Sequence, residues 1–286
     1  AVNAASSTIG IIIPPSIPMI LYGWITEVSI RDLFLAGLIP GILVGVFQIA
    51  VAAYLGYRRN YYMVKRPDPK IIWRNLKRSA LALFTPILVM GGILFGVYTT
   101  TEAAIFGALY VILIELFFYK GLTLKNLYSI IVQSAKVTGV VLFLIATSFM
   151  LTYVILLSGL PGILTASLES ILPNATVALL AIAGVLLVTG TFLDLAPALL
   201  IFTPIFYPLA LKFGVNPVQL GVVIVMVLAV GLFTPPVGQT LYISALLAET
   251  PIEDVSRNIF WFLTVIVFVV ALAIFFPHAT MFLAGL

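Results

Sequence analysis

The sequence predicts an all-α integral membrane protein, built as an inverted repeat with a re-entrant helical hairpin and two helices broken at Pro–Pro pairs. Three observations carry this prediction: the composition, the long continuous apolar runs and two related proline-containing segments. Of the 286 residues, 63% are hydrophobic and 8% are charged, and the mean hydropathy is +1.24. A soluble domain carries about 25% charged residues, so this chain has too little polar surface to face water on every side.

The residue counts exclude most enzyme classes. The chain has no cysteine, so it forms neither a disulfide nor a thiolate metal site. Its single histidine, His278, rules out a histidine cluster such as the HExxH of a metalloprotease. Asp194 is the only aspartate within an apolar segment, so the sequence holds no pair of membrane aspartates, and it holds no magnesium-binding carboxylate cluster. The sequence therefore predicts no enzyme and no organic cofactor.

One basic cluster orients the chain. Residues 58–78 hold eight basic residues and one acidic residue, a local net charge of +7, while the remainder carries −3. The apolar runs beside it make this a cytoplasmic loop under the positive-inside rule, and we place residues 56–79 in the cytoplasm. Confinement of the charge to one such loop argues against nucleic acid as a partner.

Eight apolar segments follow from the hydropathy, since about 20 apolar residues make a transmembrane helix. Their continuous rather than alternating apolar character argues against a β-barrel. Five are uninterrupted spans, at residues 33–55, 80–98, 101–119, 137–158 and 258–276. Three are broken by glycine and proline, at residues 8–26, 175–212 and 216–248. The more polar residues 120–136 are expected to include an amphipathic helix at the cytoplasmic interface.

Residues 175–212 are apolar except for a break at Thr189–Asp194. Each half has roughly 15–18 residues, or about 22–27 Å of helix, which is short for a hydrocarbon core of about 30 Å. We interpret the segment as a re-entrant hairpin that enters from the outer side, with its polar tip at the break. The alternative is a pair of short, tilted spans.

Two proline-containing segments resemble each other. Residues 10–15 (GIIIPP) match residues 231–236 (GLFTPP), and downstream residues 27–32 (EVSIRD) match residues 249–254 (ETPIED). The topology set by the basic loop makes the first copy run outward and the second inward. The repeat is therefore inverted, as in many secondary transporters.

The Pro–Pro pairs have a chemical consequence, because proline has no N–H and each pair leaves two helical carbonyls without their usual donor. These carbonyls belong to Gly10, Ile11, Gly231 and Leu232. At membrane depth a free carbonyl is costly unless it meets a cation, water or another donor, and sodium is a suitable cation. The half-helix after each break favours an anionic group such as a carboxylate. The alternative is a simple kink whose carbonyls are satisfied by the neighbouring hydroxyls of Ser6, Ser7, Thr8, Ser16, Thr234 and Thr240.

Four motifs follow one another along the chain: NAASSTIGIIIPPSIPMILYG (3–23), TTTEAA (99–104) followed by KGLTLKNL (120–127), TGTFLDLAPALLIFTPIFYPLA (189–210) and GLFTPPVGQTLYIS (231–244). In sequence and in order they resemble the large membrane subunit of the tripartite ATP-independent periplasmic (TRAP) transporters of bacteria and archaea. The resemblance covers essentially the whole chain. It implies a multi-pass protein of the cytoplasmic (inner) membrane that imports small organic acids, such as C4-dicarboxylates or sialic acid, with sodium as the coupling ion.

The same resemblance implies an elevator movement of a transport domain against a scaffold. It also implies two partners, a small four-helix membrane subunit and a periplasmic substrate-binding protein. Residues 1–26 would be the first-repeat broken helix, residues 27–136 scaffold-type spans, and residues 137–286 the second repeat. Because the chain starts within a motif, we expect it to be the C-terminal two-thirds or so of a longer subunit.

The resemblance implies two sodium sites, and the starts of the half-helices after the breaks indicate where the substrate binds. A second sodium site would join Gly190, Thr191 and Asp194 to Gly231, Thr234 and Gly238. A first sodium site would use Ser6, Ser7, Thr8 and Gly10, with its hairpin before residue 1. Residues at the starts of the second half-helices, Pro15, Ser16, Pro236 and Thr240, are assigned to the substrate.

Two acidic residues have alternative roles. Asp194 either binds sodium or caps the helix that follows it. Glu102 either takes part in transport or completes a helix cap that begins with the preceding threonines. For the whole protein, two other functions stay open at this stage: a stand-alone sodium/carboxylate symporter without a binding protein, and a scaffold subunit that transports nothing.

Overall fold

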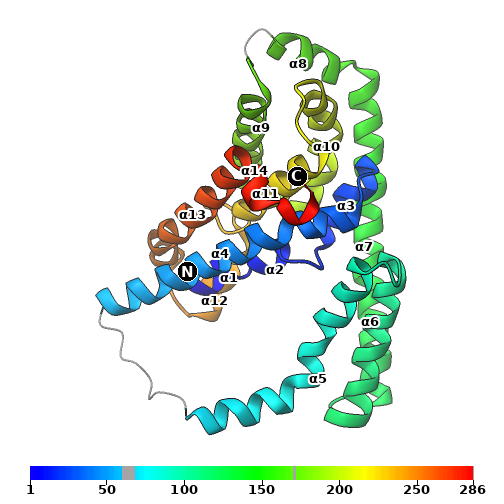
Figure 1. Cartoon of the computed structure of the whole chain (residues 1–286), viewed down its shortest axis with the longest axis vertical. Coiled ribbons are helices and arrows are strands. Elements are labelled where there is room, and N and C mark those ends of the chain that lie inside the picture. Colours follow the sequence, from blue (N-terminus) through cyan, green and yellow to red (C-terminus); the bar gives the residue numbers. More distant parts are fainter. Residues whose placement is uncertain (60–67, 170–171, 286) are drawn as a thin grey trace. The chain divides into compact units, whose positions relative to one another are not determined.

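The computed structural model describes residues 1–59, 68–169 and 172–285, and the regular elements of that part are all helical. They form two compact units, one of residues Ala1–Leu55 with Leu144–Leu286 and the other of Gly56–Phe143 (Figure 1). Six of the described helices are long and apolar enough to cross a membrane. The prediction of an all-α integral membrane protein is confirmed. Of the predicted cytoplasmic loop 56–79, residues 60–67, which include Lys65 and Arg66, lie outside the described residues.

All five uninterrupted spans are confirmed as helices. They are α4 (Ile30–Arg58), α5 (Pro69–Leu94), α6 (Thr100–Ile114) continued by the π-helix η1 (Glu115–Tyr119), α7 (Leu124–Leu157) and α13 (Ile252–Phe275). All five begin before their apolar runs, α5 and α7 by 11 and 13 residues, because polar residues at a membrane interface continue the helix in the headgroup region.

The separate interfacial helix expected within residues 120–136 is a wrong prediction. From Leu124 onward this segment forms the first turns of α7, which continues without a break to Leu157. Helix-forming residues and the absence of glycine or proline between Leu124 and Lys136 explain why the helix does not end where the polarity changes.

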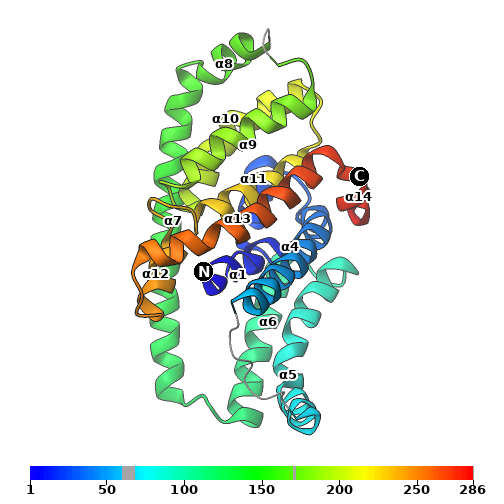
Figure 2. The same cartoon turned by 90° about the vertical axis from the view of Figure 1, so that its left-hand side faces the viewer.

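The core of the first unit is α11 (Pro217–Gly231), whose residues from Gln219 to Gly231 are all buried. It packs against α9 (Ala175–Gly190), α10 (Leu195–Lys212), α13 and the two helices α2 (Ile9–Ile12) and α3 (Ile17–Thr26). Figure 2 shows α11 between α9 and α13. A helix that is apolar all round is a buried helix, as its sequence requires.

Both predicted helix breaks are present. In the first repeat, α1 (Val2–Ser6) and α2 stand before the break and α3 follows it, with a bend of 41°. In the second, α11 ends at Gly231 and α12 (Gln239–Leu247) begins after the intervening loop. The Pro–Pro peptide bond is cis in each break. The arms of the predicted hairpin, α9 and α10, pack against each other around the tip Thr191–Asp194.

Helix α4 holds the first broken helix through a row of glycines. A Cβ atom on Gly37 would collide with the Met19 side chain, and one on Gly41 would lie 3.3 Å from the backbone nitrogen of Ile13. Small residues four apart allow close approach of helices in membranes. The α1 and α12 segments of the two repeats are also linked, since Asn3 Nδ2 donates to Ser244 Oγ at 3.4 Å. Helices α8 (Leu160–Glu169), α14 (Pro277–Thr280) and the short turn η2 (Phe282–Ala284) complete the described chain.

In the second unit, α5 packs against α6, and the predicted cap at the start of α6 is confirmed. The Thr99 N–H donates to Glu102 Oε2 at 2.7 Å, and the Glu102 N–H donates to Thr99 Oγ1 at 3.3 Å. This reciprocal pair is a capping box, which satisfies two backbone donors at the helix start. Glu102 therefore has a structural role at the start of α6.

Replacing Thr99 by alanine is expected to lower the unfolding free energy by about 1 kcal/mol, because the cap hydroxyl is lost. For a protein of this size the melting temperature should fall by about 2–4 °C. Thermal unfolding of the purified full-length subunit measures the shift. Thr101→Ala, two residues on in the same helix, is the matched control. Equal melting temperatures of Thr99→Ala and the unaltered protein would show that the cap contributes nothing.

Candidate functional site

The hairpin tip and the second helix break meet around a small cavity. Its volume is about 50 Å³, enough for one ion or water molecule, and it lies between residues 190–194 of the tip and residues 231–232 and 237–239 of the break. Five of the six residues assigned to the second sodium site line it: Gly190, Thr191, Asp194, Gly231 and Gly238. The tertiary structure thus brings together residues that are about 40 positions apart in the chain.

Four helix ends converge at this cavity. Helices α9 and α11 end there, at Gly190 and Gly231, and helices α10 and α12 begin there, at Leu195 and Gln239. Carbonyl groups at helix C-termini carry partial negative charge and N–H groups at N-termini carry partial positive charge. The two C-termini therefore favour a cation, and the two N-termini favour an anionic group beside it.

Glycine is required where the tip meets the break. A Cβ atom on Gly231 would collide with the carbonyl group of Gly190. Conversely, a Cβ atom on Gly190 would lie 3.3 Å from Leu228 Cδ2 and 3.6 Å from Gly231 Cα. The two backbones are in direct contact, so Gly231 has no room for a side chain, whereas a Cβ atom on Gly190 would meet its neighbours at close to ordinary contact distances.

Gly238 also sits close to backbone oxygens. A Cβ atom at this position would be 2.9 Å from the Thr234 carbonyl oxygen and 3.2 Å from that of Leu232. The loop after the Pro–Pro pair therefore folds back over the end of α11, which directs carbonyl oxygens toward the start of α12.

Three of the four carbonyls that lose their helical donor at the Pro–Pro pairs accept a hydrogen bond from another donor, two of them from hydroxyls named in the kink alternative. The Leu232 oxygen accepts from the Thr240 N–H at 3.0 Å and from Thr240 Oγ1 at 2.9 Å. The Gly231 oxygen accepts from the Thr234 N–H at 3.2 Å, and the Ile11 oxygen accepts from Ser16 Oγ at 2.6 Å. The physical reason is the cost of an unpaired carbonyl away from water, which nearby donors remove.

These hydrogen bonds decide which oxygens are still able to bind an ion. A carbonyl oxygen accepts two hydrogen bonds, so Leu232 is saturated, whereas Gly231 and Ile11 each keep one lone pair. For Gly10, the described part of the chain provides no donor to the carbonyl oxygen. Gly231 therefore keeps more free acceptor capacity than Leu232 at the second break, and Gly10 keeps more than Ile11 at the first.

The hydroxyls of the second site bond to their own helices. Thr191 Oγ1 donates to the Val188 oxygen at 2.7 Å, and Thr234 Oγ1 donates to the Val230 oxygen at 2.6 Å. Each hydroxyl uses its hydrogen in this bond and keeps its oxygen lone pairs for a ligand. Thr234, however, is not among the residues that line the cavity.

Asp194 acts as a helix cap in the structure, since its Oδ1 accepts from the Leu195 N–H at 2.8 Å. It also lines the cavity. The second carboxylate oxygen has no donor among the described residues, so the cap and an ion are compatible partners of the same side chain.

The hydroxyls assigned to the first sodium site bond within their own segment of the chain. The hydroxyls of Ser6, Ser7 and Thr8 each donate to the carbonyl oxygen three residues earlier, at 3.2, 2.7 and 2.7 Å. Thr8 is buried, whereas Ser6 and Ser7 are exposed, and no atom lies within 4 Å of a Cβ position on Gly10.

The four residues assigned to the substrate form two pairs, one of exposed prolines and one of hydroxyl residues that make hydrogen bonds to the breaks. Pro15 and Pro236 are exposed at the two breaks. The Ser16 and Thr240 hydroxyls, in contrast, donate to the Ile11 and Leu232 carbonyls and stabilise the breaks themselves.

Sequence reasoning missed Gln48, a buried residue of α4. Its Nε2 donates to the Ala5 oxygen at 3.2 Å, while its Oε1 is buried without a donor in the described chain. Its isolation as a polar residue within an apolar span was the signal that could have identified it. Gln48 joins α4 to the helix that carries the first-site serines.

Comparisons with known proteins agree with these features. Residues 1–279 match the family described as "Tripartite ATP-independent periplasmic transporter, DctM component". A Haemophilus influenzae protein named as a TRAP transporter large permease is 35% identical over 93% of this chain and 63% of its own length. The sialic acid TRAP transporter large permease SiaM of Vibrio cholerae is 32% identical over 99% of this chain and 66% of its own length. The C4-dicarboxylate permease DctM of Pseudomonas aeruginosa is 30% identical, over 93% and 62%.

The chain thus spans between 62% and 66% of the length of these three relatives. The matched family consists of multi-pass permeases of the inner membrane and not of enzymes. The two Pro–Pro breaks, the paired helices α9 and α10 and the match over residues 1–279 lead to one conclusion. The chain belongs to the DctM family, the large permease components of the tripartite ATP-independent periplasmic transporters.

Proposed function

We propose that this chain is the ion- and substrate-binding part of a sodium-coupled importer of small organic acids. The observation that carries the proposal is the convergence of four helix ends around the cavity between Gly190–Asp194 and the second break. A sodium ion there is favoured by the C-terminal ends of α9 and α11. A substrate carboxylate is favoured by the N-terminal ends of α10 and α12.

We propose Gly190, Thr191, Asp194, Gly231, Thr234 and Gly238 as the second sodium site. In this proposal the Gly231 carbonyl, the Thr191 hydroxyl and the Asp194 carboxylate supply oxygen ligands. Gly190 and Gly238 keep the backbones close enough for these groups to reach one ion. Thr234 contributes through its carbonyl, which lies beside Gly238.

The first sodium site of the proposal uses Ser6, Ser7, Thr8 and Gly10. Its support is the inverted repeat, together with the Gly10 carbonyl that lacks a donor in the described chain. Pro15, Ser16, Pro236 and Thr240 complete the substrate site in this proposal. Ser16 and Thr240 lie at the starts of α3 and α12, where helix N-termini favour an anion.

Substrate class and partners follow from the relatives. Two of them carry the names of a sialic acid and a C4-dicarboxylate transporter, and both substrates are carboxylic acids. We propose a carboxylate as the substrate here, delivered by a periplasmic binding protein, with a small membrane subunit beside the permease. We also propose that α9 and α10 form a re-entrant hairpin and that the first unit moves as an elevator.

Sodium-driven uptake tests the function. Proteoliposomes with the full-length subunit, its small partner and its binding protein are given labelled carboxylates, with and without an inward sodium gradient. Uptake that needs both sodium and the binding protein is the expected result. Uptake that needs sodium alone would make the protein a stand-alone symporter, and no uptake of any labelled acid would favour a scaffold role.

Thr191→Ala is expected to raise the sodium concentration for half-maximal uptake by about 5- to 15-fold, as for a lost ligand contact of 1–1.5 kcal/mol. Thr189→Ala is the matched control, because Thr189 makes the same kind of bond, to the Val185 oxygen at 3.0 Å, but does not line the cavity. Sodium titrations of uptake compare the two variants. An equal sodium requirement in both would remove Thr191 from the site.

A further inference from the structure

The first turns of α5 form a strongly basic helix face. Lys70, Arg74, Lys77 and Arg78 are spaced four, three and one residues apart, which places them on one side of the helix. All four are exposed, and in the described part of the chain no carboxylate pairs with any of them. The nearest acidic residue, Asp68, uses its Oδ1 to cap the helix, accepting from the Lys70 N–H at 2.9 Å.

The other side of these turns is apolar and equally exposed. Ile72, Trp73 and Leu76 have exposed fractions of 50%, 60% and 48%. Trp73 lies at the border between the two sides, where the Lys77 Nζ is 5.4 Å from the centre of its ring. A helix with lysine and arginine on one side and tryptophan and aliphatic residues on the other is suited to the headgroup region of a membrane.

A bend separates these turns from the apolar remainder of α5 (Figures 1 and 2). The Tyr119 hydroxyl donates to the Arg78 oxygen at 2.8 Å and accepts from the Ala82 N–H at 3.4 Å. In an undisturbed α-helix the Ala82 N–H would donate directly to the Arg78 oxygen. The Tyr119 hydroxyl is therefore inserted between two backbone groups of the helix.

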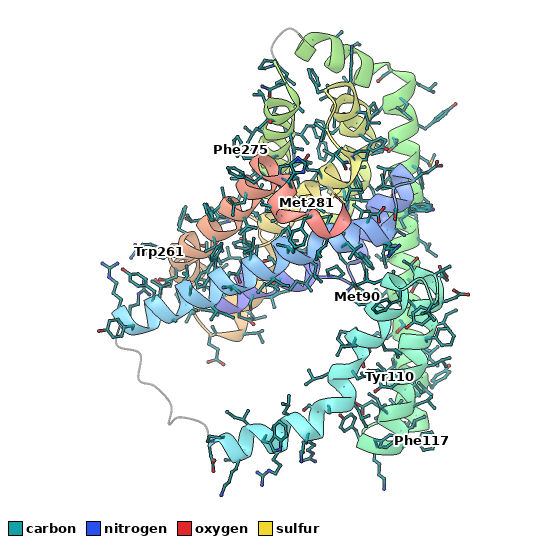
Figure 3. All side chains as sticks on the ribbon, viewed as in Figure 1. Met90, Tyr110, Phe117, Trp261, Phe275 and Met281 are labelled. Carbon is teal, nitrogen blue, oxygen red and sulfur yellow. The ribbon has the colours of Figure 1, made fainter. Side chains whose placement is uncertain are left out.

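Two further features support the bend. The Tyr110 hydroxyl, from α6, donates to the Leu81 oxygen at 2.9 Å, and Pro86 leaves the Ala82 carbonyl without its helical donor. Tyr110 is labelled in Figure 3. Tyr119 is the last residue of the π-helix η1, a rare form that is frequent at functional sites. The second unit therefore uses two tyrosines to hold the basic turns at an angle to the membrane span.

We propose that Pro69–Arg78 is a binding surface for anionic phospholipid headgroups of the cytoplasmic leaflet. The positive-inside rule places these turns on the cytoplasmic side. The four cations complement the phosphate charge, and the apolar side with Trp73 complements the adjoining acyl chains. A soluble phosphate compound would contact only the four cations. A lipid would contact both the cations and the apolar side, so a lipid is the ligand that matches the whole surface.

The test measures lipid binding by the purified full-length subunit in neutral detergent, titrated with phosphatidylglycerol, phosphatidylcholine or glycerol phosphate. Each basic residue near an anionic surface strengthens binding about fivefold. The combined variant Lys70→Gln, Arg74→Gln and Lys77→Gln should therefore bind phosphatidylglycerol about a hundredfold more weakly. Binding by the unaltered protein should also weaken with added salt.

The matched control removes three lysines elsewhere in the same unit, as Lys120→Gln, Lys125→Gln and Lys136→Gln. Its phosphatidylglycerol binding should stay within about threefold of the unaltered protein, and melting in phosphatidylcholine should be unchanged in both variants. Equal losses in the two variants would overturn the proposal, since only net charge would then matter. Equal affinity for phosphatidylcholine, or for glycerol phosphate, would also overturn it.

Discussion

Replacing Gly231 by alanine should reduce uptake by about 10- to 100-fold while the protein still inserts into the membrane. The added methyl group would collide with the Gly190 carbonyl group, so the hairpin tip would have to move away from the second break. Overpacking of this kind costs about 1–3 kcal/mol. The colliding atoms are backbone atoms of Gly190, which cannot avoid the methyl group by a change of side-chain rotamer. Because both sides of the cavity are displaced, sodium affinity should fall together with the rate of uptake.

Gly184→Ala provides the control for this experiment. Gly184 lies in the same helix α9, and no atom is within 4 Å of its Cβ position. Uptake and sodium affinity are expected to stay near those of the unaltered protein, with slightly higher stability from the better helix former. If Gly231→Ala transports as well as Gly184→Ala, the contact between tip and break is not required for transport.

Asp194→Asn should raise the sodium concentration for half-maximal uptake by about 10- to 100-fold. Asparagine is as good a helix cap as aspartate, so the start of α10 should stay intact. The substitution removes the negative charge that the cavity offers to a cation, a loss of about 1.5–3 kcal/mol for an interaction with a charged group. Sodium titration of uptake therefore separates the two roles of Asp194.

Asp194→Ala completes the comparison, because alanine removes both the cap and the charge. Its melting temperature should fall below that of Asp194→Asn, while the sodium requirement of the two should be similar. A normal sodium requirement in Asp194→Asn, with a loss only in Asp194→Ala, would mean that Asp194 is a cap alone.

The helices themselves were largely predictable. Apolar runs of sufficient length identify α4, α5, α6, α7 and α13, since the bilayer sets the length that a span needs. The Pro–Pro pairs identify both breaks for an equally local reason, the missing N–H. The wrong boundary near Lys136 shows the limit, because a change of polarity does not end a helix whose backbone hydrogen bonds continue.

The candidate site was only partly predictable. The residue types and the repeat indicated which segments to consider, but the fate of the released carbonyls depended on where Ser16 and Thr240 fold back. The bend of α5 had no clear sequence signal apart from Pro86. Its inserted hydroxyl comes from Tyr119, 41 residues from Arg78 in the chain.

The sequence by itself determined that the chain lies in a membrane, that it is helical, where two of its helices break and that residues 58–78 are strongly basic. Each of these depends on local composition or on neighbouring backbone groups. Only the tertiary structure decided that Gly190 meets Gly231, that Asp194 both caps α10 and lines the cavity, and that Gln48 reaches Ala5. These contacts join distant segments, and they depend on how whole helices pack, which no local pattern of residues specifies.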